Sequence, residues 1–191
     1  LAKAVLLSLT TGLLATFLSV AGSFLLLVAC FNSRFFGWLR RLAGPLVAIP
    51  HAAVAIGMVF LLAPSGWLFR LLSPGLTGFD RPPVWSLVPD PHGFALIFGL
   101  MAKEIPFLLL VAMAATARLP VQRLADVATS LGYGRYASWG LVILPLIYHH
   151  LRLPIMAVLV FSLSVVDMAL LLAPTLPPPL SVLVLNGFYD A

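Results

Sequence analysis

The sequence predicts an all-α, polytopic transmembrane helical bundle. Its 191 residues are 62% hydrophobic and only 9% charged, whereas soluble domains contain roughly 25% charged residues. No charged residue lies between Lys3 and Arg34, and none lies between Arg41 and Arg70. Each of these intervals exceeds the roughly 20 apolar residues that a helix needs to cross the hydrocarbon. The composition therefore excludes a water-exposed globule and predicts a single transmembrane domain over residues 1–191.

Four complete membrane spans are expected, over residues 4–31, 44–63, 94–117 and 142–173. Pro64 follows the second span and Pro174 ends the fourth. Residues 177–191 are interpreted as a loop leading to a missing final helix, because Asp190 interrupts the last apolar run. The chain begins at Leu1 rather than Met, and we expect it to be a fragment of a longer protein.

The distribution of charge predicts how these spans are oriented. If residues 32–43 and 118–140 are cytoplasmic, residues 64–93 and 174–191 are external. The inner side then holds Arg34, Arg40, Arg41, Arg118, Arg123 and Arg135. The outer side holds Lys3, Arg70 and Arg81, offset by Asp80, Asp90 and Asp190. Because basic residues accumulate in cytoplasmic loops, this orientation is favoured.

The external segment 64–93 is expected to be an ordered loop. Its many prolines and glycines exclude a long helix. Trp67 and Trp85 suit the aromatic belt at the membrane interface.

Within the segment 118–140, the pattern of residues predicts two short helices at an angle. Pro120 suits the first turn of a helix, where its missing N–H is unpaired anyway. Gly132 and Gly134 are expected to end that helix, because glycine accepts the left-handed backbone that a C-cap requires. Tyr136 and Trp139 begin the second helix, which leads into the membrane. One apolar face is formed at helical spacing by Val121, Leu124, Ala128 and Leu131.

The stretch DVATSLGYGRYASWGLVILP, from Asp126 to Pro145, has the pattern [acid]-x-Ala-x3-Gly-x9-[Val/Ile]-x-Leu-Pro. It resembles the cytoplasmic loop by which permease subunits of binding-protein-dependent ABC importers grip their ATPase, Glu-Ala-Ala-x3-Gly-x9-Ile-x-Leu-Pro. Asp126 stands for the Glu, Val127 for the first Ala and Val142 for the Ile. The residues that match outright are Ala128, Gly132, Leu144 and Pro145. Without this resemblance, an amphipathic helix lying on the cytoplasmic surface would explain the segment equally well.

The resemblance covers nearly the whole chain. IPHAAVAIGMVFLL is similar to the family's proline-marked second core helix, and FSLSVVDMALLLAP to the helix after the loop, which often carries an acidic residue. One departure is Pro154, which follows Pro145 by nine residues, whereas many members place a proline about four residues after the loop's Leu-Pro. Among these permeases, the chain most resembles a subgroup linked to thiamine-type systems.

The resemblance implies the type I importer fold in the bacterial inner membrane and transport by alternating access. It implies as partners two ABC ATPase subunits, a second permease subunit or half, and a periplasmic solute-binding protein, in addition to membrane lipid. Residues implied to couple to the ATPase are Asp126, Ala128, Gly132, Tyr133, Gly134, Arg135, Tyr136, Leu144 and Pro145. The closing of the ATPases would push this loop and open the membrane helices toward the receptor.

Three ionisable residues lie within the expected spans. Lys103 and Glu104 are near the middle of the third span and Asp167 is near the external end of the fourth. Such residues are expensive in hydrocarbon and usually face a water-filled path or pair with another helix. Both interpretations, a lining of the translocation path and a structural pairing, stay open. A rival function, a proton-coupled secondary transporter, would use these same three residues as a proton relay.

Several other classes of site are not expected. The chain has no G-x4-G-K-[S/T] motif, so ATP must be handled by another chain. His149 and His150 are neighbours whose side chains diverge on a helix, without a third ligand at metal-binding spacing. No nucleophile–base pair indicates an enzyme, no cofactor motif is evident, and no solvated basic face indicates a nucleic-acid partner.

Overall fold

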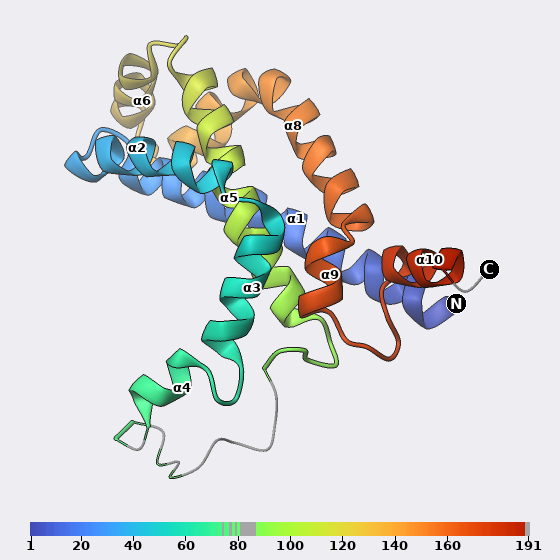
Figure 1. The fold of residues 1–191 in the computed structure, drawn as a ribbon. Helices are drawn as coiled ribbons and strands as arrows, with labels where there is room; N and C mark the ends of the chain where they lie inside the picture. The colour runs from blue at the N-terminus through green and yellow to red at the C-terminus, as the bar shows by residue number, and fades with distance from the viewer. Residues whose placement is uncertain (74, 77, 79, 81–86, 190–191) are drawn as a thin grey trace. The chain divides into compact units, whose positions relative to one another are not determined.

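A computed structural model describes residues 1–73, 75–76, 78, 80 and 87–189. These residues form helices, turns and bends and include no β-strand, which confirms the predicted all-α fold class. Three residues used above, Arg81, Trp85 and Asp190, lie outside the described residues. The helices are α1 Ala2–Cys30, α2 Arg34–Ala48, α3 His51–Leu62, α4 Trp67–Leu72, α5 Phe94–Thr116, α6 Val121–Ser130, α7 Arg135–Ser138, the π-helix η1 Trp139–Ile143, α8 Leu144–Ser164, α9 Asp167–Leu172 and α10 Leu180–Tyr189 (Figure 1).

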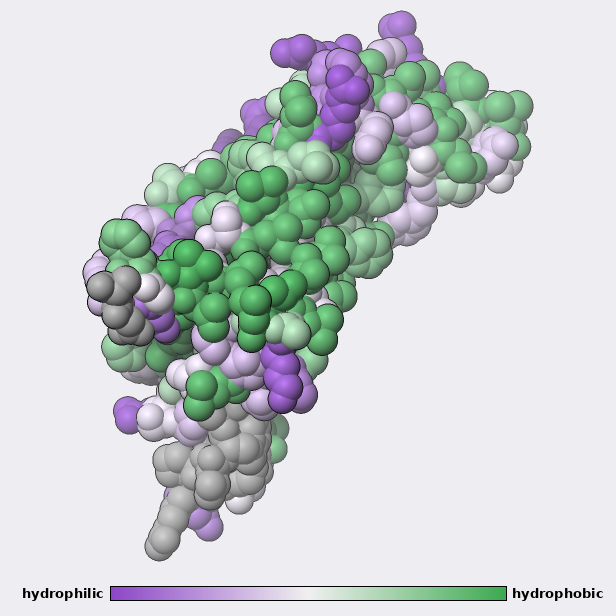
Figure 2. All heavy atoms as spheres, turned by 90° about the vertical axis from the view of Figure 1, so that its right-hand side faces the viewer, coloured by the Kyte–Doolittle hydropathy of each residue, from purple (hydrophilic) through white to green (hydrophobic). Residues whose placement is uncertain are grey.

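Among the described residues, four helical segments are long and apolar enough to cross a membrane: Ala2–Cys30, His51–Leu72, Phe94–Thr116 and Arg135–Ser164. Apolar side chains cover much of the visible surface of the described residues (Figure 2). Phe17, Phe60 and Leu153, which lie within these segments, are 68%, 67% and 72% exposed. Exposed apolar surface of this extent is typical of a protein that faces lipid or other membrane helices.

The second span and the loop before it differ from the prediction. The expected loop 32–43 is largely helix α2, and this helix continues through Pro45 to Ala48. The break falls at residues 49–50, because the ring of Pro50 disfavours a helical backbone at the residue before it. The second span therefore begins at His51 and not at residue 44.

The fourth span also ends earlier than residue 173. Helix α8 stops at Ser164, and α9 begins at Asp167 after a break. The Asp167 carboxylate accepts a hydrogen bond from the Met168 amide at 2.9 Å, and an acidic side chain is favourable at a helix N-terminus. In the break, the Val165 carbonyl accepts a hydrogen bond from the Ser181 hydroxyl at 2.7 Å. Both contacts stabilise the interrupted helix.

The prediction that residues 177–191 form a loop is wrong for residues 180–189, which form α10. The prolines just before Leu180 cannot continue a helix but suit its start. The Leu180 amide, which has no partner within the first turn, donates to the Ser8 hydroxyl at 2.7 Å. The apolar run before Asp190 thus forms a short helix whose first turn is supported by a distant part of the chain.

The chain divides into two compact units, each with a core of its own. Unit 1 comprises residues 1–15, 49–103 and 159–191. In its core, α5 approaches α9 so closely that a Cβ atom at Gly99 would lie 2.5 Å from Leu172 Cδ1. Small residues are typical of such close packing between membrane helices.

Unit 2 comprises residues 16–48 and 104–158 and contains the candidate coupling segment. Its core joins α1, α5, η1 and α8 through buried side chains, among them Leu27, Leu109, Trp139, Ile143 and Ile147. Helix α6 packs against α7 and η1, and this packing positions the segment discussed next.

Candidate functional site

Helix α6 ends in a Schellman motif at the predicted glycine. Gly132 has φ +88°, a left-handed conformation that costs other L-residues roughly 1–2 kcal/mol. The Gly132 amide donates to the Thr129 carbonyl at 2.9 Å, and the Tyr133 amide donates to the Ala128 carbonyl at 3.0 Å. These two bonds satisfy carbonyl groups that the helix end would otherwise leave without partners. The predicted role of Gly132 as a helix stop is confirmed.

Gly134 and Pro120 have other roles than expected. Gly134 has φ −68° and ψ 166°, an extended conformation, and is the N-cap residue of α7. It therefore precedes the start of a helix and does not end one. Pro120 occupies the N-cap of α6, with Val121 as the first helical residue. The two predicted short helices are present, α6 and α7, but α7 continues directly into the membrane segment.

The predicted apolar face of α6 is only partly buried. Val121 and Ala128 are each 3% exposed, whereas Leu131 is 72% exposed. Leu131 is the C-cap residue, with φ −87° and ψ 5°. Because its backbone departs from helical geometry, its side chain does not lie on the buried face of α6. Ala128, which matches the family pattern, is therefore a small residue at the place where α6 packs closely.

Two side chains fasten the segment to the end of α1. Arg135 Nη2 donates to the Phe31 carbonyl oxygen at 3.0 Å, just beyond the last residue of α1, where a cation interacts favourably with the helix dipole. Trp139 is 2% exposed and packs edge-on against the Phe31 ring, with centroids 4.8 Å apart. Trp139 was predicted only to begin a helix, and nothing in the local sequence indicates that Phe31 is its partner.

Asp126 lies on a polar groove and does not point into the core. It accepts a hydrogen bond from Gln122 Nε2 at 2.9 Å, and Gln122 Oε1 in turn accepts one from Asn32 Nδ2 at 3.4 Å. The groove has a volume of about 460 Å³, and its lining also includes Tyr133 and Arg135. These bonds fix the orientation of the Asp126 carboxylate beside the end of α1.

The outward side of the segment carries exposed apolar groups. We define the outer face as Val127, Leu131 and Tyr136, which are 60%, 72% and 55% exposed; Tyr133, 44% exposed, lines the groove that contains Asp126. Val127 and Leu131 are four residues apart, a spacing that places side chains on the same side of a helix. The exposure of Val127 and Leu131 was not predicted, because helical period alone did not show which side of α6 is covered.

Leu144 and Pro145 begin α8, directly after the π-helix η1. A proline in a helix lacks an amide donor, and its ring clashes with the carbonyl four residues earlier, here that of Leu141. The wider turn of a π-helix accommodates such a disruption. Leu144 packs against the unit 2 core, while Pro145 is exposed.

The intramembrane charges have different surroundings. Lys103 and Glu104 are 4% and 3% exposed, and each has a partner within its own unit. Lys103 Nζ donates to the Ile49 carbonyl oxygen at 2.6 Å, and Glu104 Oε2 accepts from the Ser19 hydroxyl at 2.7 Å. Asp167 is exposed at the start of α9. Lys103 and Asp167 belong to unit 1, and Glu104 belongs to unit 2.

Comparison with models of protein families finds no match. Among curated proteins, the chain is similar to the Inner membrane ABC transporter permease protein YnjC of Escherichia coli (strain K12). The two are 33% identical over 138 residues, which are 72% of this chain and 25% of the relative, so the chain spans about a quarter of that relative's length. Together with the four apolar helices, this similarity supports an ABC transporter permease in the inner membrane. It favours a transporter subunit over an enzyme, and it does not favour a proton-coupled secondary transporter.

Proposed function

We propose that the chain is part of the transmembrane subunit of an ATP-driven solute importer, and that residues 118–145 couple it to an ATPase. The observation that carries this proposal is the Schellman turn at Gly132. It joins an outer face of exposed apolar groups to a segment fastened on α1. An apolar face of this kind is suited to a protein partner.

The proposed mechanism assigns ATP hydrolysis to separate ABC ATPase subunits. The outer face, with Val127 and Leu131 at its centre, docks in a groove of the ATPase. Arg135 and Trp139 transmit the movement to the end of α1, because both contact Phe31. We further propose a type I importer architecture with a second permease subunit or half and a periplasmic solute-binding protein. Thiamine-type solutes are the first substrates to test.

Lys103 and Glu104 are assigned a structural role under this proposal. Lys103 holds the carbonyl of Ile49, the residue before Pro50, in the break that precedes α3. Glu104 is hydrogen-bonded to Ser19 of α1. A buried charge needs such partners in a low-dielectric interior. Asp167, exposed beside the break after α8, is the better candidate for a residue of the translocation path.

The test is detergent co-purification of the longer protein with a candidate ABC ATPase. Leu131→Asp should abolish retention of the ATPase, because it places a charge in the apolar outer face, and Asp126→Lys should weaken it. Leu76→Asp is a matched control, since Leu76 is 82% exposed but lies in the segment expected on the external side. If Leu131→Asp and wild type retain the ATPase equally, the outer face is not the docking surface. If well-folded wild-type protein retains no ATPase, the importer proposal fails.

A further inference from the structure

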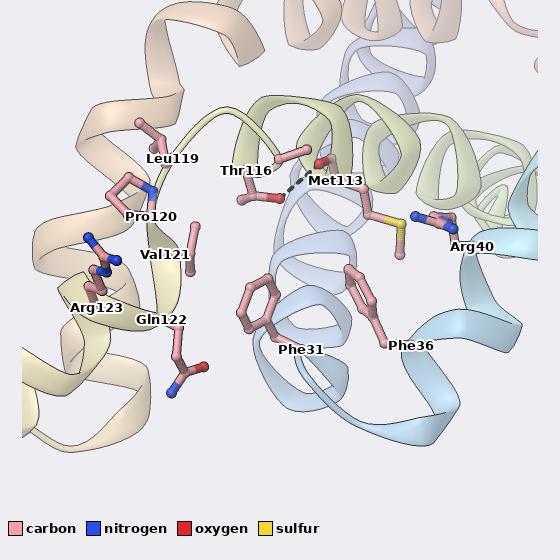
Figure 3. A pocket seen from close by; sticks show the side chains of 11 residues that line it. Phe31, Phe36, Arg40, Met113, Thr116, Leu119, Pro120, Val121, Gln122 and Arg123 are labelled. Atoms are coloured by element: carbon pink, nitrogen blue, oxygen red, sulfur yellow. Dashed lines mark hydrogen bonds between the residues drawn. The ribbon is translucent and has the colours of Figure 1, made fainter.

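A second groove lies in unit 2, beside the coupling segment but apart from its outer face. It has a volume of about 640 Å³ and is bounded by the end of α1, helix α2, the end of α5 and the start of α6. Figure 3 shows the rings of Phe31 and Phe36 in the middle of this groove. Met113 and Val121 add further apolar surface to its wall. We call it the basic groove, because of the two residues described next.

Two arginines from different helices line the basic groove. Arg40 comes from α2 and Arg123 from α6, and they lie on opposite sides of the two aromatic rings (Figure 3). Both arginines are exposed, and the described lining residues include no aspartate or glutamate. The groove thus combines an apolar middle with positive charge at its margins.

The positions of the neighbouring helices place this groove at the edge of the hydrocarbon. The membrane segment α1 ends at Cys30 and the membrane segment α5 ends at Thr116, and both ends adjoin the groove. On α2, the exposed rings of Phe35 and Trp38 have centroids 5.0 Å apart. A helix that presents arginines together with exposed aromatic rings is typical of the membrane interface.

We propose that the basic groove binds an anionic phospholipid of the cytoplasmic leaflet. Arg40 and Arg123 lie at opposite margins of the groove, so one guanidinium group pairs with the headgroup phosphate, whose geometry suits arginine, and the other adds electrostatic attraction. The acyl chains lie against Phe31, Phe36 and Met113. Basic pockets at the cytoplasmic ends of membrane helices suit such headgroups. A lipid bound there contacts both α2 and α6, so it stabilises the position of α6 at the membrane interface.

The experiment is native mass spectrometry of the purified chain in detergent, titrated with phosphatidylglycerol or phosphatidylcholine of identical acyl chains. The wild type should bind phosphatidylglycerol more tightly. Removing both groove arginines, in Arg40→Gln with Arg123→Gln, should weaken phosphatidylglycerol binding about thirtyfold, given the usual contribution of each arginine near an anionic surface. Lysine at both positions should retain only part of the binding, since the charges remain but the paired geometry of the guanidinium group is lost.

The matched control is Arg41→Gln with Arg118→Gln. It removes the same net charge from the same side of the protein, but neither residue lines the groove, so binding should fall much less than in the groove variant, by loss of screened surface attraction alone. The proposal is overturned if the two double variants weaken binding equally, if phosphatidylcholine binds as tightly as phosphatidylglycerol, or if inorganic phosphate displaces the lipid. Binding of lipid does not require an ATPase, so failure here leaves the proposed coupling function standing.

Discussion

The left-handed turn at Gly132 allows the geometry of the proposed coupling segment to be tested by adding a single methyl group. A Cβ atom at position 132 would meet no atom within 4 Å, so Gly132→Ala introduces no steric clash with other residues. Its whole cost is the left-handed backbone, φ +88°, which is about 1–2 kcal/mol for an L-residue. A destabilisation of that size raises the open population of the turn by roughly five- to thirtyfold.

Gly134 provides the matched control. A Cβ atom there also meets nothing within 4 Å, but φ is −68°, a value that alanine adopts without strain. Gly134→Ala should therefore leave the turn unchanged or stabilise it by about 0.4–1 kcal/mol. Gly132→Asn should fall between wild type and Gly132→Ala, because asparagine tolerates the left-handed region better than alanine.

The assay is hydrogen exchange at the Tyr133 amide, which donates to the Ala128 carbonyl in this turn. Exchange should accelerate in Gly132→Ala by the fold-change given above, and it should stay unchanged or slow in Gly134→Ala. Gly132→Val, with a β-branched side chain, should uncouple the ATPase from transport or detach it, while membrane insertion stays intact. Equal exchange rates in Gly132→Ala and Gly134→Ala would refute the assignment of the turn, and normal transport by Gly132→Val would refute its role in coupling.

Three further substitutions test other parts of the molecule. Asp90→Ala should lower the free energy of unfolding by about 2 kcal/mol. The Asp90 carboxylate accepts hydrogen bonds from the amides of His92, Phe94 and Ala95 at 3.1, 2.9 and 2.7 Å. The thermal unfolding midpoint should therefore fall, and an unchanged midpoint would contradict this prediction. Gly99→Val should destabilise unit 1 by about 1–3 kcal/mol through overpacking. Gly57→Val should not destabilise it in this way, because a Cβ atom at Gly57 would meet nothing within 4 Å. Similar shifts of the unfolding temperature in both variants would rule out the close packing at Gly99. Glu104→Gln should change thermal stability and leave the transport rate unchanged if Glu104 is structural, and an altered rate would move Glu104 into the translocation path.

The sequence predicted best the features that depend on local backbone chemistry. A glycine after an amphipathic helix indicates a left-handed C-cap wherever the helix lies, and Gly132 has that conformation. The third span was also predicted closely, as residues 94–117 against the observed Phe94–Thr116, because proline and glycine precede it and arginine follows it.

The features that the sequence did not predict depend on the surroundings of each helix, including contacts between residues that are distant in the sequence. Helix α2 was expected as a loop because its arginines indicated water, yet an interfacial helix satisfies arginine and apolar residues together. Helix α10 depends in part on Ser8, which lies at the other end of the sequence. The exposure of Leu131 depends on the C-cap geometry and on what covers α6, and neither is visible in helical periodicity.

Under the proposed function, the two sides of the proposed coupling segment explain why its turn must be rigid. The outer face is available to a partner, while Arg135 and Trp139, only a few residues along the chain, are fixed to Phe31. A force on Val127 or Leu131 passes along the chain to Arg135 and Trp139 only if the connection between α6 and α7 does not bend. The Schellman bonds of Gly132 and Tyr133 and the hydrogen bond from the Ser138 hydroxyl to the Gly134 carbonyl at 3.0 Å resist such bending. Under the proposed function, loosening this turn should therefore reduce transport more than it reduces the binding of the ATPase.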